Sequence, residues 1–122
     1  MARILIVEDN ATNRRLAVLI LETAGYTVLS AADAEAGLTV AREERPDLIL
    51  MDIQLPGMDG LEATALLKGD DATRAIPVIA LTALAMIGDE ERIRAAGCDG
   101  YVAKPMRYQE LLATITAQLA RS

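Results

Sequence analysis

The stretch 46–60 constrains the fold of this chain more than any other part of its sequence. It contains a run of apolar residues at 48–51 that does not alternate with polar ones. Such a run is typical of a strand buried on both faces, as in a parallel sheet. Asp52 ends the run, and the turn-forming residues 55–57 (Leu-Pro-Gly) follow it. Because parallel sheets place their ligand sites at the carboxyl ends of strands, Asp52 is a candidate functional carboxylate.

The rest of the chain alternates short apolar runs with amphipathic segments. Asn10, Asp33 and Asp59 each precede a helical pattern and are predicted to be N-caps. The segment 27–31 is the most polar of the expected strands and therefore suits a sheet edge. Strands are expected at 4–7, 27–31, 48–51, 77–81 and 100–103, and helices at about 11–24, 34–45, 59–69, 88–96 and 107–120.

The apolar residues of the helices indicate which faces pack inward. Cys98 is expected to be a small, partly buried residue. The first helix has Leu16, Leu19, Ile20 and Ala24 on one face, the second has Ala34, Leu38 and Ala41, and the last has Tyr108, Leu111, Leu112, Ile115 and Leu119 at helical spacing.

Five strand-helix units without an internal linker predict a parallel sheet with helices on both faces. A chain of 122 residues is long enough for one domain with a real core and too short for two. We therefore expect one α/β domain over residues 1–122. Its predicted fold is flavodoxin-like and doubly wound, with a five-stranded parallel sheet of order 2-1-3-4-5 and five helices.

Charge and composition exclude several classes of function. The net charge of −6 argues against nucleic-acid binding, because phosphate backbones attract basic surfaces. Cys98 is the one cysteine and cannot form an internal disulfide, which suits a reducing compartment. The first apolar run ends at Glu8, too early for a signal peptide or a membrane span. We expect a cytoplasmic protein with no nucleic-acid or membrane partner.

Polar side chains follow four of the expected strands, at the edge of the sheet where the carboxyl ends meet. With the order 2-1-3-4-5, the first and third strands are neighbours, and the fourth and fifth strands follow on the other side of the third. The chain should therefore bring together Glu8, Asp9, Asp52, Thr82 and Lys104.

Three clustered carboxylates repel one another unless protons or a cation neutralise them. An all-oxygen site suits Mg²⁺, whereas a zinc site is close to excluded by the lack of histidine and the single cysteine. A carboxylate beside Mg²⁺, a hydroxyl and an ammonium group suits phosphoryl chemistry, in which the carboxylate can be the nucleophile.

Each of these residues also has an ordinary explanation. Asp9 could cap a helix, Asp52 could be a turn residue and Thr82 could be an N-cap. Lys104 could be a solvated loop residue, and Tyr101 could be a fixed core residue. These explanations are independent of one another, so they do not account for the convergence of such residues on one edge of the sheet.

Over its whole length the chain resembles the receiver domains of two-component response regulators. In more detail, 48–56 and 88–94 resemble the DivK-like single-domain regulators and the receivers of hybrid kinases. The resemblance is carried by Glu8-Asp9, the segments 51–56 and 58–60, Thr82-Ala83 and Lys104-Pro105, in this order and spacing.

The resemblance implies that Asp52 accepts a phosphoryl group from a histidine kinase or a phosphotransfer protein. Mg²⁺, or Mn²⁺, would be bound by Asp9, Asp52 and the backbone carbonyl of Gln54. Glu8, a variant of the usual Asp, would act on the cation directly or through water. Such a protein catalyses only its own phosphorylation and dephosphorylation, and is not otherwise an enzyme.

The resemblance also implies a switch. The Thr82 hydroxyl and the backbone N–H of Ala83 would hold the phosphoryl oxygens, and Lys104 would pair with them. As Thr82 moves toward the phosphate, Tyr101 would turn inward. The face of the fourth helix, fifth strand and fifth helix would then bind a downstream protein, or a second copy of the phosphorylated chain. The Lys104–Pro105 peptide bond would be cis.

Several alternatives and details accompany this interpretation. Because no output domain follows Ser122, we expect a stand-alone receiver. The alternative is a receiver excised from a hybrid kinase or a larger regulator. An Asp-nucleophile phosphatase of the haloacid-dehalogenase group usually has a second Asp where Gln54 stands. A flavodoxin would have a Ser/Thr/Gly-rich loop in place of Glu8-Asp9.

Two further expectations concern the surroundings of the site. The phosphodonor is expected to dock on the start of the first helix, at Asn13, Arg14 and Arg15, and on Met106. Gln54 and Leu84 are expected to hinder the water that hydrolyses the phosphate.

Overall fold

The computed structural model describes residues 2–83, 89–105 and 107–121, in which strands and helices alternate from end to end. All paired strands are parallel, and the sheet order is β2-β1-β3-β4-β5. The predicted fold class and strand order are confirmed. The strands are β1 (Arg3–Val7), β2 (Thr27–Ala31), β3 (Leu48–Asp52), β4 (Val78–Thr82) and β5 (Gly100–Ala103), and the helices are α1 (Ala11–Thr23), α2 (Ala34–Glu44), α3 (Gly60–Lys68), α4 (Asp89–Ala95) and α5 (Tyr108–Arg121).

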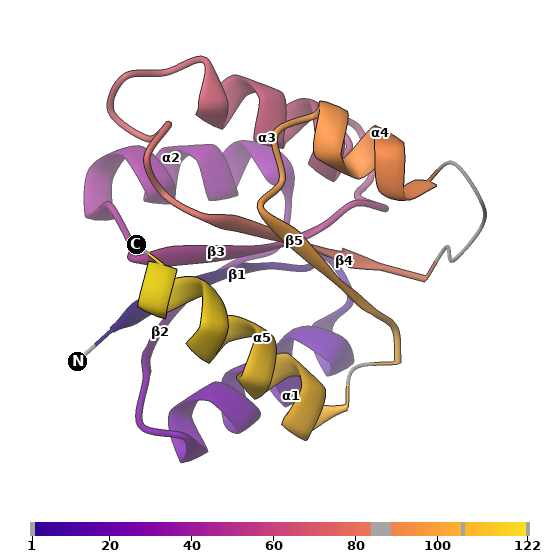
Figure 1. The fold of residues 1–122 in the computed structure, drawn as a ribbon. Coiled ribbons are helices and arrows are strands. Elements are labelled where there is room, and N and C mark those ends of the chain that lie inside the picture. Colours follow the sequence, from indigo (N-terminus) through magenta and orange to yellow (C-terminus); the bar gives the residue numbers. More distant parts are fainter. Residues whose placement is uncertain (1, 84–88, 106, 122) are drawn as a thin grey trace.

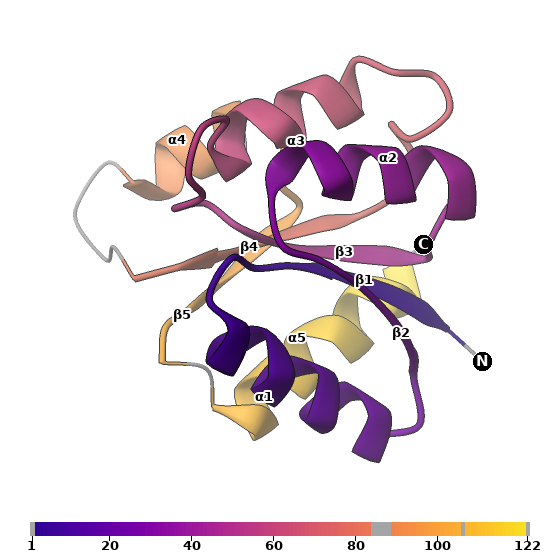
Figure 2. The ribbon, with the colours of Figure 1, turned by 180° about the vertical axis from the view of Figure 1, so that it is seen from behind.

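The helices form two layers around the sheet, with α1 and α5 on one face and α2, α3 and α4 on the other (Figures 1 and 2). Each layer encloses its own apolar core, and successive residues of the central strands alternate between the two cores. Leu5 and Ile49 belong to the core under α2 and α3, whereas Ile4 and Leu48 belong to the core under α1 and α5. The uninterrupted apolar runs of the sequence follow from this burial on both faces.

The polar residues predicted to begin three helices are N-caps in the structure. The side chains of Asn10, Asp33 and Asp59 each accept a hydrogen bond from the backbone N–H three residues later, at 2.8 to 2.9 Å. The predicted helix ends lie within two residues of the observed ones. Gly88, the predicted start of the fourth helix, lies outside the described residues.

The packing face predicted for α1 is wrong. Leu16 and Leu19 are 46% and 62% exposed, whereas Ala17 and Leu21 are completely buried. Ala17 and Leu21 lie one turn apart on the helix, and the small Ala17 lets α1 approach the sheet closely. Two apolar stripes therefore run along this helix, and the bulkier stripe faces outward. Ile20, also placed on the predicted face, is only partly buried.

The last helix follows the prediction except at its start. Leu111 and Ile115 are buried against the sheet, and Leu112 and Leu119 are partly buried beside them. Tyr108 was also expected to pack there, but its side chain is 55% exposed, because it stands at the first position of α5. Within the described residues, no helix is both long enough and apolar enough to span a membrane.

Gly60 fixes the distance between the start of α3 and the end of β3. A Cβ atom at this position would lie 2.7 Å from the Cα of Ile53 and would also overlap the backbone carbonyl of Asp52. Its backbone N–H donates to the carbonyl of Ile53 over 3.2 Å. The helix and the strand end that carries Asp52 therefore touch through main chain, without an intervening side chain.

Candidate functional site

The acidic side chains meet because β1 and β3 are neighbours in register. Val7 pairs with Met51, so the next residues along the chain, Glu8 and Asp52, lie at the same edge of the sheet. Glu8, Asp9 and Asp52 each offer a carboxylate oxygen, and these oxygens all lie within 4.8 Å of one another. Glu8 and Asp52 are buried, whereas Asp9 is exposed, so the cluster has two enclosed members and one that opens to solvent.

Lys104 reaches this cluster from the loop after β5. Its Nζ donates to Glu8 Oε1 over 2.7 Å and to Asp52 Oδ2 over 2.8 Å. Its backbone N–H donates to the carbonyl of Thr82 over 2.7 Å, which holds this loop against the end of β4. The following peptide bond, Lys104–Pro105, is cis. One ammonium group is thus shared between two buried carboxylates.

The charges of the site determine how strongly it holds protons. Burial raises the pKa of Glu8 to about 7 from its ordinary value of 4.5; the hydrogen bond to Asp52 and its negative charge add to this, and Lys104 opposes it. Burial lowers the pKa of Lys104, but the hydrogen bonds and negative charges of Asp52 and Glu8 outweigh burial and raise that pKa overall. Glu8 therefore keeps its proton to a higher pH than an ordinary glutamate does, and a bound cation would compete with that proton.

The second oxygen of Asp52 is also held. Oδ1 accepts a hydrogen bond from the backbone N–H of Gln54 over 2.9 Å. The N–H of Ile53 donates to the carbonyl of Leu81 over 3.1 Å, which ties the same loop to β4. Both carboxylate oxygens of Asp52 thus accept a hydrogen bond, and the side chain is oriented before any ligand binds.

Thr82 and Tyr101 lie on the strands next to Asp52. Asp52 pairs with Leu81 in the register of β3 and β4, so the buried Thr82 follows directly at the strand end, and Ala83 beyond it is exposed. Tyr101 pairs with Ala80 in the register of β4 and β5, and its side chain is 43% exposed. The structure thus gathers Glu8, Asp9, Asp52 and Lys104 directly and places Thr82 at their border, while the Tyr101 side chain reaches the surface.

The donor set fits the cation expected from the sequence. It consists of the three carboxylates of Glu8, Asp9 and Asp52, of which the Asp9 side chain is exposed. Mg²⁺ prefers a small number of carboxylates together with water, and an open, oxygen-only pocket of this kind provides such a site. The residues present are therefore suited to Mg²⁺.

Arg14, one of the residues predicted to bind the phosphodonor, has different contacts from those predicted. Arg14 was expected to face a docking partner, but its guanidinium turns back on the loop after β1 and contacts the carbonyls of Glu8 and Asp9. The sequence contains no signal for this contact, because the helical pattern does not tell which of two adjacent arginines points toward the loop. Met106 and Leu84, also predicted to border the site, lie outside the described residues.

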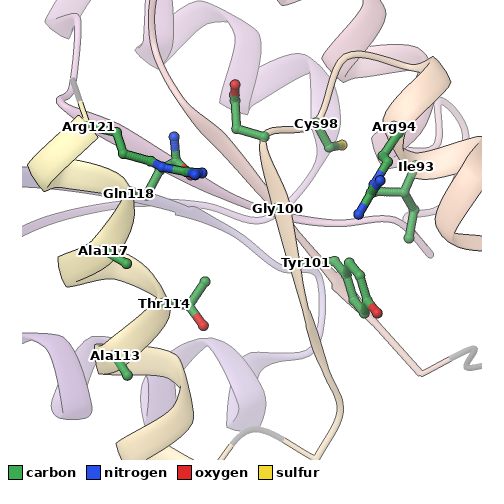
Figure 3. Close-up of a pocket in the computed structure, with 11 residues that line it drawn as sticks. Ile93, Arg94, Cys98, Gly100, Tyr101, Ala113, Thr114, Ala117, Gln118 and Arg121 are labelled. Carbon is green, nitrogen blue, oxygen red and sulfur yellow. The ribbon is translucent and has the colours of Figure 1, made fainter.

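A groove of about 430 Å³ runs along β5 between α4 and α5. Figure 3 shows α5 on one side of it and α4 on the other, with Gly100 of β5 between them. Small side chains of α5 leave the groove open, and cationic side chains stand on both walls. The lining includes Arg94, Tyr101, Ala113, Thr114, Ala117 and Arg121.

Comparison with known proteins agrees with this geometry. Residues 4–116 match the family model described as "Response regulator receiver domain". The polar-differentiation response regulator DivK of Brucella anthropi is 51% identical over 116 residues, which cover 95% of this chain and 94% of that protein.

Solved structures show the same likeness. The chemotaxis protein CheY4 of Vibrio cholerae is 30% identical with a TM-score of 0.91, and the match covers 96% of this chain and 98% of that one. The receiver domain of a sensor histidine kinase from Pseudomonas aeruginosa is 38% identical with a TM-score of 0.91, covering 98% of each chain. That domain was solved with a magnesium ion coordinated in its active-site cleft.

Proposed function

Because this chain belongs to the response regulator receiver family, it is a phosphorylation switch rather than a conventional enzyme, and we propose that Asp52 is its phosphoacceptor. The observation that carries the proposal is the setting of Asp52. Its carboxylate is buried at a strand end, is held through both oxygens, and lies beside Lys104 and two further carboxylates.

The proposed chemistry uses the atoms of this pocket. One carboxylate oxygen of Asp52 forms a bond to phosphorus while the bond from phosphorus to the donor breaks, and that electron pair leaves with the donor. The Lys104 ammonium already lies 2.8 Å from Asp52. As negative charge develops on the phosphoryl oxygens, this ammonium can therefore exchange its contact with the carboxylate for a contact with them. Thr82 and the N–H of Ala83, at the end of β4, would hold the other oxygens.

The cation site completes this proposal. Asp9 and Asp52 would hold Mg²⁺ or Mn²⁺ together with the backbone carbonyl of Gln54, and Glu8 would contribute directly or through water. When bound, the cation neutralises negative charge on the transferring group. Asp9 is the exposed member of the cluster, so its carboxylate is accessible to a cation from the solvent.

A receiver of the two-component type implies a histidine kinase as partner, and a phosphotransfer protein is the second candidate donor. We propose that the donor docks on the outward apolar stripe of α1. Leu16 lines a cavity of about 350 Å³ that also includes Ala83 and Lys104, so this stripe leads directly to the site. Arg15, exposed beside Leu16, offers a positive charge to an acidic donor surface.

We further propose that phosphorylation changes the face formed by α4, β5 and α5. Tyr101 connects the site around Asp52 with this face. It stands on β5 next to the strand that ends in Thr82, and it also lines the groove in Figure 3. A downstream protein, or a second phosphorylated copy, would bind there. Residues 1–122 are proposed to act as one receiver domain in the cytoplasm, either by themselves or as a module of a hybrid kinase or larger regulator.

Phosphoryl uptake from a small donor tests the assignment. The protein incubated with acetyl phosphate and Mg²⁺ should gain the mass of one phosphoryl group, and EDTA should prevent this gain. Asp52→Asn should abolish it, whereas Asp71→Asn, at a side chain that is 91% exposed, should not change it. A phosphoryl group retained by the Asp52→Asn variant would show that the acceptor is a different residue.

A further inference from the structure

Arg14 links the start of α1 to the loop that carries two of the site carboxylates. Its Nη1 donates to the carbonyl oxygen of Glu8 over 2.8 Å and lies 3.4 Å from that of Asp9. The Arg14 side chain is half-buried, whereas the neighbouring Arg15 is exposed. The two arginines therefore have different environments although they are adjacent in the sequence.

The path of this loop decides where the carboxylates stand. On one side the N–H of Glu8 donates to the carbonyl of Ala31 over 3.1 Å, which fixes the residue against β2. On the other side the N–H of Asn10 lies 3.4 Å from Glu8 Oε2, and Asn10 caps α1. Between these two points, the Arg14 guanidinium contacts two successive carbonyls of the loop.

The choice of acceptor matters for the site. A guanidinium that paired with the carboxylates of Glu8 or Asp9 would compete with a cation for them. Arg14 instead donates to main-chain carbonyls, so the Glu8 carboxylate keeps its contact with Lys104 and the Asp9 carboxylate keeps its access to solvent. The contact can hold the loop without using the groups that bind the ligand.

We infer that Arg14 is a positioning residue for the cation site: it holds the carbonyls of Glu8 and Asp9 so that their side chains converge on Asp52. The inference rests on the proposed function, since the cation is the Mg²⁺ of that proposal. It assigns different roles to the adjacent arginines, with Arg14 serving the site and Arg15 remaining available to a partner.

Charge and position act on cation affinity in opposite directions, so the sign of the effect separates them. Loss of a positive charge near a divalent cation should strengthen binding, because a repulsive neighbour is removed. Loss of a group that positions the ligands should weaken binding, because the carboxylates must then be ordered during binding. Removal of Arg14 is expected to weaken binding.

The experiment measures Mg²⁺ affinity of the unphosphorylated protein by isothermal titration calorimetry. Arg14→Gln should bind Mg²⁺ about tenfold more weakly than the unaltered protein, the lower end of the effect of outer-shell partners. Arg15→Gln removes the same charge one residue away and should leave the affinity unchanged or slightly higher. Arg14→Lys keeps the charge but can reach one carbonyl only, so it should bind with intermediate affinity.

Amide hydrogen exchange without Mg²⁺ gives a second readout. The amides of Asp9 and Asn10 should exchange faster in Arg14→Gln than in Arg15→Gln. Equal or tighter Mg²⁺ binding by Arg14→Gln would overturn the inference and leave the proposed function standing. If Arg14→Gln does not fold, Arg14→Lys decides, and an affinity equal to that of the unaltered protein overturns the inference. Failure of the unaltered protein to bind Mg²⁺ would refute the proposed cation site itself.

Discussion

Glu8 and Lys104 are 96 positions apart in the chain and form an ion pair of 2.7 Å whose carboxylate is 1% exposed. Lys104 makes a second ion pair with Asp52 at 2.8 Å, so one ammonium group pairs with carboxylates at the ends of two neighbouring strands. The first and last thirds of the fold are thereby joined at the site. The metal-free pocket consequently depends on Lys104 for its balance of charge.

Replacement of Lys104 should destabilise the metal-free protein. In Lys104→Met, Glu8 and Asp52 keep their burial and lose their shared cation, which should lower the free energy of unfolding by roughly 3 kcal/mol at pH 8. The loss should be smaller at pH 6, where Glu8 can take up a proton instead. Chemical denaturation in EDTA at both pH values measures it, and addition of Mg²⁺ should restore part of the stability. An equal loss at both pH values would contradict this account.

Stability without a metal should also depend on pH through Glu8. Its pKa is raised from 4.5 to about 7 in the folded protein, so the folded state holds a proton that the unfolded state has released between these values. The contribution of Glu8 to stability is therefore fully present below about 4.5 and is lost as the pH rises through about 7. Comparison with Glu8→Gln in EDTA isolates this contribution, because the variant lacks the proton. Identical pH profiles for the two proteins would show that Glu8 does not hold it.

The same carboxyl should make Mg²⁺ binding dependent on pH. Below about 7 the cation must displace the Glu8 proton, so the apparent affinity should rise as the pH increases from 6 to 8 and then level off. Calorimetric titrations in buffers of different ionisation enthalpy should detect the released proton. Glu8→Gln should flatten the dependence, and proton release that persists in this variant would assign it to another group.

Gly60→Ala should be strongly destabilising although alanine favours helices. The added Cβ meets the main chain of Asp52 and Ile53, which cannot move aside as a flexible side chain could. We expect a loss of about 3 kcal/mol in the free energy of unfolding, at the upper end of the effect of overpacking. Gly100→Ala is the control, because the nearest atom lies 4.0 Å from its added Cβ. Similar losses in both variants would argue against the close contact.

The outward stripe of α1 should affect phosphotransfer without affecting the fold. Leu19→Ser changes a side chain that is 62% exposed, so its effect on the free energy of unfolding should stay within about 0.5 kcal/mol. Phosphotransfer from the kinase should slow on the order of tenfold, as expected for loss of an interface anchor. Uptake from acetyl phosphate should not change. Leu66→Ser, at a 48% exposed position of α3, is the matched control.

Charge reversal at Arg15 tests the same surface by a different interaction. Arg15→Glu should slow transfer from the kinase and make the remaining rate less sensitive to salt, because an attractive charge has become repulsive. Uptake from acetyl phosphate again provides the control. Unchanged kinase transfer by both Arg15→Glu and Leu19→Ser would place the docking surface elsewhere.

The sequence predicted the sheet and the site edge well, for a physical reason. Short apolar runs such as 48–51 are typical of strands covered on both faces, and caps such as Asn10 are local hydrogen bonds. Once the strand order is known, the ends of neighbouring parallel strands meet, so the convergence of Glu8, Asp52 and Lys104 follows from topology.

The side-chain directions that depend on tertiary packing were not predictable. In α1 the small Ala17 faces the sheet, whereas the larger Leu16 and Leu19 face outward. A small side chain at the contact allows the helix to pack close to the sheet, and this favours Ala17 over a bulkier residue. Arg14 and Arg15 are the same residue type on the same helix, and only the path of the loop after β1 distinguishes them. A hydrophobicity pattern contains neither the distance between elements nor the route of a loop.

The main-chain contact at Gly60 also determines where a reporter group can be attached. Because α3 and the end of β3 meet without a side chain between them, a probe on the outer surface of α3 has a short main-chain connection to Asp52, the proposed phosphoacceptor. A fluorophore at Leu66 would therefore serve as a stationary reference, and a second fluorophore on α5 would measure displacement relative to it. Energy transfer between the two would follow the protein through its cycle in real time, with no need to label either the kinase or the receptor of the signal.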